Sequence, residues 1–287
     1  MADAPAAKTV QAAQTPPGFG PVHTGPITAL QFIARILDQT GAPNRAKTVD
    51  HVSAGDPTSA VTGIATMAMA SLDCLKQAAA GGHNLIVSYE PGFWSGNDDL
   101  DRLEGNALFL EKRDFIRARN LVVFNLHDHW RDRMPDALAV GMADALGWSQ
   151  YQTGKDGLFR RAPMTLLELA TELQAKLKDT SLRVVGDPKL VVRSVAASWG
   201  NTAQMPAIEL LNGSADAVVT GYTHEWEAVE YAQDMIATGQ AKALILLGDV
   251  ASLEFGMRSC AAWLNSFISE VPVAFIAAGQ AYWTPQG

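Results

Sequence analysis

The sequence predicts an α/β protein built of two related lobes. Short apolar runs, typical of buried parallel strands, alternate along the 287 residues with segments whose apolar positions recur at helical spacing. A Gly-Asp-Pro triplet stands between two short predicted strands in each half, at 55–57 and 186–188. The order of strands, helix, buried strand and polar strand end recurs in both halves, which indicates an internal repeat. We therefore place a leader at residues 1–26, the first lobe at 27–150 and the second lobe at 151–287.

Composition and charge argue against several classes of protein. Hydrophobic residues make up 48% of the chain and charged residues 18%, as in ordinary globular domains. The net charge of -8, without any block of Lys or Arg, argues against nucleic acid or an anionic membrane as a partner. No apolar run approaches the roughly 18 residues of a transmembrane helix. Cys74 and Cys260 are too few and too far apart for a zinc knuckle or a disulfide framework, so we expect two buried thiols.

The leader is rich in Ala, Pro and Gly and lacks the apolar core of a signal peptide. Two interpretations stay open. In one, the leader is disordered or lies on the surface of a protein that is cytoplasmic by default. In the other, it is the mature start of an exported, periplasmic protein to which a Met has been added.

In the first lobe, apolar residues at three- and four-residue spacing predict helices at 27–40, 67–80, 106–119 and 135–147. Gly41, Gly81 and Gly147 stand where three of these helices should end. Two short strands flank the first Gly-Asp-Pro turn, and apolar runs predict buried strands at 84–87 and 121–124. Pro91 prevents the first of these strands from continuing.

The second lobe is expected to repeat this alternation. An amphipathic pattern predicts a helix at 166–177, and further helices follow from His224 to 237 and from Glu254 to 267. The predicted strands are 182–185, 191–197, 217–220, 243–247 and 273–276.

Polar side chains gather where these buried strands end, and in open α/β sheets binding sites form at the carboxyl ends of strands. Glu90 follows the strand at 84–87, and the run His127, Asp128, His129 follows the strand at 121–124. In the second lobe the corresponding strand ends carry His224 with Glu225, and Asp249.

Imidazole and carboxylate groups are the usual ligands of Zn, Mn and Fe. If the segment at 127–129 is extended, His127 and His129 face one pocket and Asp128 points away or supports a ligand. Structural interpretations compete with this hypothesis. A lone histidine is more often a satisfied core or surface group, and a carboxylate at a helix start, such as Glu254 or Glu225, stabilises the helix dipole without any further role.

Five segments in a fixed order carry a resemblance to a known family: GDP followed by VTGIAT, NLIVSYEPGFW, HDHWRDRMPDALAVGMADALGW, THEWEAVEYAQDM and LILLGDVASLEFGM. Together they resemble the Nif-three-like dinuclear metal centre hexameric protein family, also labelled GTP cyclohydrolase type-two-like, over residues 27–282. The resemblance implies two related α/β lobes, a toroidal homo-oligomer (a hexamer) and a two-metal site between the lobes. Metal-dependent hydrolysis is the activity commonly supposed for the family.

This chain departs from the family pattern at the ligand positions. It has Tyr89-Glu90 for a His-His or His-Glu pair, Arg131 for a carboxylate or His, Asp249 for a His, Leu253 for a Glu, and Tyr222 for an acidic residue. The cation of Arg131 would repel a divalent ion, and Leu253 offers no lone pair. We therefore do not expect the family's dinuclear centre, and we expect Arg131 to pair with Glu90 or Asp249 in its place.

Two functions remain open. In the first, the pocket between the lobes has been remodelled and binds a small molecule without any metal, or the ring serves as a scaffold; its expected lining is Tyr89, Arg131, Tyr222 and His224. In the second, the protein is a hydrolase that keeps one divalent ion (Zn, Mn or Fe) on Glu90, His127, His129 and Asp249. Glu225 or Glu254 would then act as the general base.

Overall fold

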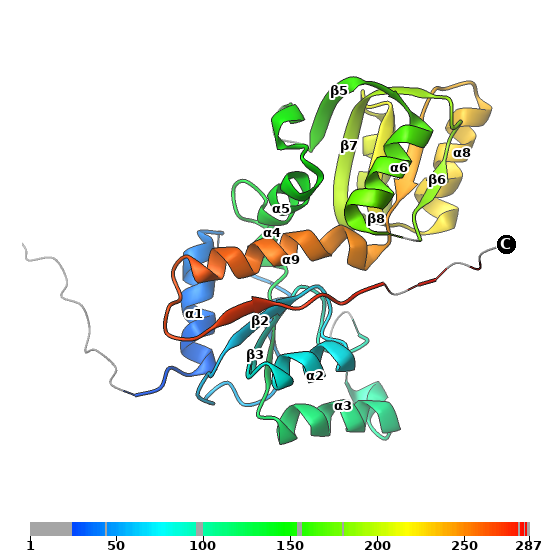
Figure 1. Ribbon diagram of the computed structural model, residues 1–287. Coiled ribbons are helices and arrows are strands. Elements are labelled where there is room, and N and C mark those ends of the chain that lie inside the picture. The colour runs from blue at the N-terminus through cyan, green and yellow to red at the C-terminus, as the bar shows by residue number, and fades with distance from the viewer. Residues whose placement is uncertain are drawn as a thin grey trace, which may run out of the picture.

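The computed structural model describes residues 25–43, 45–95, 100–153, 157–179, 181–280, 282–283 and 285. The leader predicted at 1–26 therefore lies, apart from its last two residues, outside the described residues. Within them the chain forms two five-stranded sheets with helices packed on both faces, as Figure 1 shows. The predicted α/β class with two lobes is confirmed. No helix in these ranges combines the length and apolar character needed to cross a membrane.

The first sheet is mostly parallel and fully buried at its centre. Its order is β1 (His51–Ala54), β4 (Val122–Asn125), β3 (Leu85–Ser88), β2 (Ile64–Met67) and β10 (Val273–Phe275). Only β1 is antiparallel to its neighbour. Every residue of the three central strands is buried, which explains why their sequences are continuous apolar runs rather than alternating ones.

The second sheet has antiparallel strands at both edges. Its order is β5 (Leu158–Thr165), β7 (Val191–Asn201), β8 (Ala217–Tyr222), β9 (Ala243–Leu246) and β6 (Arg183–Val185). β7, β8 and β9 are parallel, whereas β5 and β6 run against their neighbours. We did not predict β5, because this edge strand contains two arginines and a proline and lacks the apolar run that marks the buried strands.

The two lobes repeat one plan down to individual hydrogen bonds. In the first lobe the carbonyl of Pro57, in the Gly-Asp-Pro turn, accepts the N–H of Leu30 at 2.8 Å, near the start of a helix. In the second lobe the carbonyl of Pro188 accepts the N–H of Leu167 at 3.1 Å, at the same place in the next repeat. Read from β1 and from β6, the two sheets have matching strand orders, so that β3 corresponds to β8 and β4 to β9.

Three layers of helices enclose the two sheets. α2 (Leu72–Ala80) and α3 (Ala107–Ala118) cover the outer face of the first sheet, and α7 (Gln204–Asn212) and α8 (Glu230–Ala237) pack on the outer face of the second. The helices that bury apolar side chains in the core shared by both lobes are α1 (Ala29–Thr40), α4 (Asp128–Arg131), α5 (Ala137–Leu146), α6 (Leu166–Leu177) and α9 (Asp249–Asn265). Figure 1 shows α9 running across the middle of the molecule between the lobes.

Close approach between α5 and α9 depends on two glycines. A Cβ added at Gly141 would lie 2.5 Å from Ser259 Oγ and 3.0 Å from the Cα of Gly256. A Cβ added at Gly256 would lie 2.2 Å from Leu138 Cδ1 and 3.1 Å from the Leu138 Cα. The lobes are therefore joined by a helix crossing that leaves no room for a larger side chain at either position.

Several predicted boundaries are corrected by the structure. The helix expected at 67–80 begins only at Leu72, because Met67 still belongs to β2. The helix expected from Glu254 begins at Asp249, since Gly248 (φ 84°) lets the chain turn straight from β9 into α9. β10 falls in the range that we assigned to the second lobe, but it pairs with β2 of the first sheet. The two cysteines are buried and free, as expected.

Candidate functional site

The candidate site forms where the central strands of both sheets end. The N–H of Leu126 donates to Ser88 O at 2.8 Å, and the N–H of Leu247 donates to Thr220 O at 2.9 Å. These matching hydrogen bonds continue the pairing of β3 with β4 and of β8 with β9 past the ends of the strands. Beyond them each lobe begins a helix with an aspartate, Asp128 in α4 and Asp249 in α9.

The carboxylate of Asp50 closes the start of α4. It accepts the backbone N–H groups of His127 (2.8 Å), Asp128 (2.7 Å) and His129 (3.0 Å), and its own side chain is only 1% exposed. These groups are among the donors that a helix start leaves without partners. The segment is thus a helical turn, and our expectation that it is extended, with His127 and His129 facing one pocket, is wrong.

His129 and Asp128 are both held by the segment that precedes β1. The Nδ1 atom of His129 lies 2.7 Å from Asp50 Oδ2. Asp128 accepts hydrogen bonds from the N–H of Val49 (3.1 Å) and the hydroxyl of Thr48 (3.0 Å). Burial alone would raise the pKa of Asp128, but these hydrogen bonds, together with that from His127, hold the pKa below its ordinary value.

His127 instead joins Tyr89 and Arg131 in the space between the lobes. The rings of Tyr89 and His127 lie 4.5 Å apart, and Tyr89 is 1% exposed. Burial raises the pKa of Tyr89, and the neighbouring Arg131 guanidinium opposes that shift. The Tyr89 hydroxyl has no well-formed hydrogen bond among the described residues. Arg131 donates to Trp199 O in the second lobe at 3.4 Å and lies 3.7 Å from Asp136, so its ion pair is with Asp136 rather than with Glu90 or Asp249.

Glu90 and Asp249 come from different lobes and line the same cavity. Burial, reinforced by the charge of Asp249, raises the pKa of Glu90 to about 7. Burial also raises the pKa of Asp249, while the nearby His127 opposes the shift. The Oδ1 atom of Asp249 is shielded from water and has no hydrogen-bond partner among the described residues. A carboxyl that titrates near neutrality beside a second carboxyl can take up or release a proton at ordinary pH.

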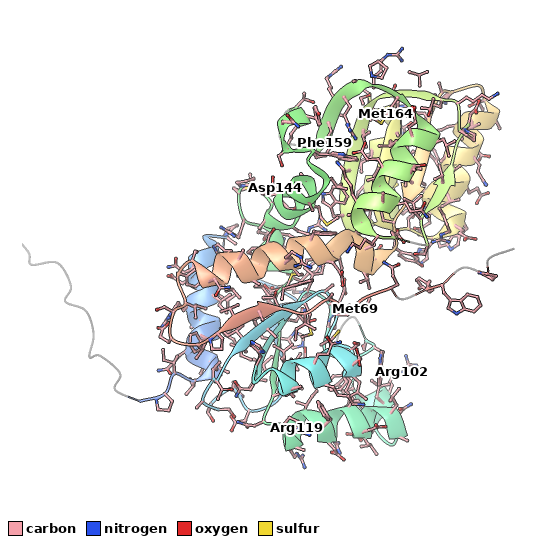
Figure 2. All side chains as sticks on the ribbon, in the orientation of Figure 1. Met69, Arg102, Arg119, Asp144, Phe159 and Met164 are labelled. Carbon is pink, nitrogen blue, oxygen red and sulfur yellow. The ribbon has the colours of Figure 1, made fainter. Side chains whose placement is uncertain are left out.

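Two cavities meet at Asp249 and Met69. The first, which we call the carboxylate cavity, has a volume of about 310 Å³ and is lined by Met69, Ala70, Ser71, Glu90, Pro91, Phe93, Trp94, Ser95, Lys112 and Asp249. The second, which we call the inter-lobe cavity, has a volume of about 510 Å³ and is lined by Met69, 181–183, Tyr222, 247–251, Gly279, Gln280 and Tyr282. Figure 2 shows Met69 between the two lobes.

The other predicted pocket residues lie at the edge of the second lobe. Tyr222 is 38% exposed and lines the inter-lobe cavity, and its ring meets that of His224 edge-on at 5.6 Å. His224 stacks on the exposed ring of Trp226, with centroids 5.6 Å apart, and its Nδ1 lies 3.1 Å from Glu227. Glu225 is exposed and lies 3.3 Å from Arg183.

Glu254, proposed from the sequence as a general base, holds the C-terminal segment. One carboxylate oxygen accepts the backbone N–H groups of Ala278 (2.6 Å) and Gly279 (3.1 Å). These hydrogen bonds place residues 278–279 beside the start of α9. In this arrangement Glu254 fixes one wall of the inter-lobe cavity.

The donor set does not fit the two metal ions that the family resemblance implies. Within the described residues, no three His, Cys, Asp or Glu side chains converge as a metal site requires. Leu253 is fully buried, with its Cδ2 atom only 3.1 Å from a Cβ added at Gly200. The half-buried guanidinium of Arg131 stands beside Tyr89, at another position where the family pattern has a ligand. A hydrophobic side chain and a cation thus stand at two positions where the resemblance implies metal ligands.

A model of the Duf34/NIF3 (NGG1p interacting factor 3) family matches residues 28–280. The chain belongs to the Duf34/NIF3 family. Three solved structures show the same fold. Staphylococcus aureus protein SA1388 has a TM-score of 0.68 and 17% identity, over 91% of this chain and 100% of that one. A Bacillus cereus protein related to NIF3 has a TM-score of 0.70 and 11% identity, over 91% and 100%.

The third, reduced HcgD from Methanocaldococcus jannaschii, has a TM-score of 0.61 and 15% identity, over 86% of this chain and 97% of that one. No curated protein matches the sequence. At these identities the similarity establishes the fold of this NIF3-family chain.

Sequence reasoning missed Asp50 and Lys112. Asp50 lies 77 residues before its first partner, and no local spacing connects them. Lys112 belongs to α3 but is only 4% exposed; its ammonium donates to Gly92 O at 2.5 Å and lies over the rings of Phe93 (5.2 Å) and Trp94 (5.4 Å). A lysine on an amphipathic helix is normally solvated, so the aromatic pair at 93–94 was the only signal.

Proposed function

We propose that this Duf34/NIF3 protein binds a small molecule in the pocket between its lobes, where the family resemblance implies two metal ions. The observation that carries the proposal is the chemistry at the ligand positions. Arg131 contributes a permanent cation and Leu253 contributes no donor atom, while Glu90 and Asp249 remain and line a cavity of about 310 Å³. Cavities of this size, with an apolar wall and a few convergent polar groups, commonly hold small ligands.

The arrangement divides the roles among the residues. Tyr89, whose ring is tilted against that of His127, would support the site from within the core, and Arg131 would link this support to the second lobe through Trp199 O. Glu90 and Asp249 would contact the ligand, because they line the carboxylate cavity. Tyr222 would contribute an aromatic wall to the adjoining inter-lobe cavity.

Metal analysis tests the proposal. Elemental analysis of protein purified without chelator or added metal should find less than about a tenth of an ion per chain. Adding Zn, Mn or Fe should leave the thermal midpoint unchanged, because only a ligand that binds the folded state raises it. Stoichiometric metal that is lost in Glu90→Gln would contradict the proposal.

A matched pair of variants tests the assignment of the ligand positions. Arg131→His together with Leu253→Glu would return ligand-type side chains to both positions, and metal uptake should increase. Arg119→His adds a histidine at an exposed site at the end of α3 and should have no effect. Unchanged uptake in the double variant would mean that these residues do not stand where the family's ligands would be.

A single-ion hydrolase is the second candidate, favoured by one observation. Glu90, Asp249 and His127 are electrostatic neighbours although they come from both lobes. His129 would not take part, since its ring faces Asp50, and Glu254 is engaged with the C-terminal segment. Assembly into a toroidal homo-hexamer, implied by the resemblance, stays a prediction that sedimentation velocity can test.

A further inference from the structure

We infer that the carboxylate cavity binds a protonated amine, which Glu90 and Asp249 hold between them. The inference rests on the proposed small-molecule function and names the class of its ligand. Its starting point is an imbalance of charge: two carboxylates from different lobes line one cavity, and no described cation forms an ion pair with either.

The neighbouring cations are engaged elsewhere. Arg131 bonds to Trp199 O and pairs with Asp136. Lys112, which also lines the cavity, donates to Gly92 O and lies over the rings of Phe93 and Trp94. His127 interacts electrostatically with Asp249, but its Nδ1 atom lies 3.1 Å from Asp128. A cationic ligand would supply Glu90 and Asp249 with the positive partner that these described cations do not provide.

A hydrogen-bond acceptor at the same place specifies what kind of cation fits. Asp249 Oδ1 is shut off from water and has no hydrogen-bond partner among the described residues, and a buried acceptor without a donor is costly. A primary ammonium group can donate N–H bonds to both carboxylates, whereas a quaternary ammonium has no hydrogen to donate. A divalent metal would need further donors, and no group of three acidic, His or Cys side chains converges in the described part of the chain.

The remaining wall of the cavity indicates an apolar body on the ligand. Pro91, Phe93 and the 55%-exposed Trp94 line the cavity, together with Met69 and Ala70. The ammonium of Lys112 already lies over the two aromatic rings. The charge of the ligand therefore belongs at the carboxylate end, and its hydrocarbon part belongs against the aromatic wall.

Benzylamine and its neutral counterpart benzyl alcohol, which have similar size, test the inference by ligand-observed NMR and calorimetry. Benzylamine should bind at least about tenfold more tightly than benzyl alcohol. Glu90→Gln and Asp249→Asn should each weaken benzylamine binding by about tenfold and leave benzyl alcohol binding unchanged. Glu209→Gln, which removes an exposed carboxylate on α7, serves as the matched control and should behave as the wild type.

Circular dichroism and the thermal midpoint establish that each variant is folded. Equal binding of the two compounds, or benzylamine binding that survives both substitutions, overturns the amine inference while the small-molecule function stands. If zinc binds instead, and Glu90→Gln abolishes its binding, both the inference and the proposed function fail. If neither organic compound binds and metal analysis is also negative, the amine inference is wrong, and the carboxylate cavity is not the binding site of the proposed small-molecule function.

Discussion

Both lobes turn from a central strand into a helix that begins with an aspartate, yet the two turns are completed in different ways. In the first lobe, Asp50 accepts three backbone N–H groups at the start of α4, and α4 ends after a single turn. In the second lobe, no side chain of the described residues caps α9, which runs from Asp249 for 17 residues. Residues 247–251 at that turn line the inter-lobe cavity. The same framework thus has one strand end closed by its own chain and one that faces a cavity.

The ends of β3 and β8, which correspond in the two lobes, differ in which side chains they bury and which they expose. Beyond β3 the chain places Tyr89 in the core and Glu90 in the carboxylate cavity. At the end of β8 it exposes Tyr222, followed by the stacked rings of His224 and Trp226. At these two strand ends the first lobe contributes a buried carboxyl, and the second contributes aromatic surface. The carboxylate cavity and the inter-lobe cavity, which these strand ends line, share Met69 and Asp249.

The largest effect is expected where the lobes are joined. Gly141→Ala combined with Gly256→Ala should lower the free energy of unfolding by about 2–4 kcal/mol, because each new Cβ meets atoms closer than 3.0 Å and overpacking costs about 1–3 kcal/mol per site. Urea unfolding measures the loss. Gly25→Ala, whose added Cβ meets nothing within 4 Å, is the control. A double variant as stable as the wild type would show that α5 and α9 can separate without cost.

Removing Asp50, which caps α4, and removing Asp249, the first residue of α9, should have different effects on the free energy of unfolding. Asp50→Ala leaves three backbone donors and His129 without their acceptor and should cost about 1–3 kcal/mol in urea unfolding. Asp249→Ala should cost much less or stabilise the protein, because it removes a half-buried carboxylate with an unpartnered oxygen. Equal losses in the two variants would contradict the contrast between a closed and an open strand end.

The pH dependence of stability should reveal Glu90. Its pKa is raised to about 7, so between its ordinary value and about 7 the folded state binds more protons than the unfolded state. Stability from this group is therefore present at low pH and is lost as the pH rises through about 7, by roughly 1–2 kcal/mol after solvent screening. Glu90→Gln should remove that slope in urea unfolding from about pH 5 to about pH 8. Parallel curves for the wild type and Glu90→Gln would exclude the shift; Glu209→Gln should leave the slope intact.

Local patterns were sufficient to predict much of the framework. The apolar spacing of α6 predicted residues 166–177, as the structure has them, and the paired Gly-Asp-Pro triplets predicted the repeat. Each of these features depends on residues close in sequence, or on a turn that its own residues specify. The fold could therefore be argued from short stretches.

The errors arose where distant segments decide the local conformation. The turn at 127–131 is helical because Asp50 binds its donors from 77 residues away, and β10 belongs to the first sheet because Val273 pairs with Ile64. Local sequence left Glu254 available as a general base, but in the structure its carboxylate accepts the backbone N–H groups of residues 278–279. Site residues depend on such contacts more than strands do. Of the metal ligands proposed from the sequence, His129 faces Asp50 at the start of α4, whereas Glu90 and Asp249 line one cavity.

The smallest effect tests the repeat itself. Thr28 caps α1 and Thr165 caps α6, each as part of a capping box in which the third residue of the helix, Gln31 or Glu168, bonds back to the cap. Thr28→Ala and Thr165→Ala should each lower the free energy of unfolding by about 1 kcal/mol, and by amounts that agree within a few tenths. The corresponding Ser substitutions keep the hydroxyl oxygen and should restore most of the loss. If one alanine variant costs several times as much as the other, the two lobes do not share the energetics of their helix starts, and the correspondence between them is one of shape alone.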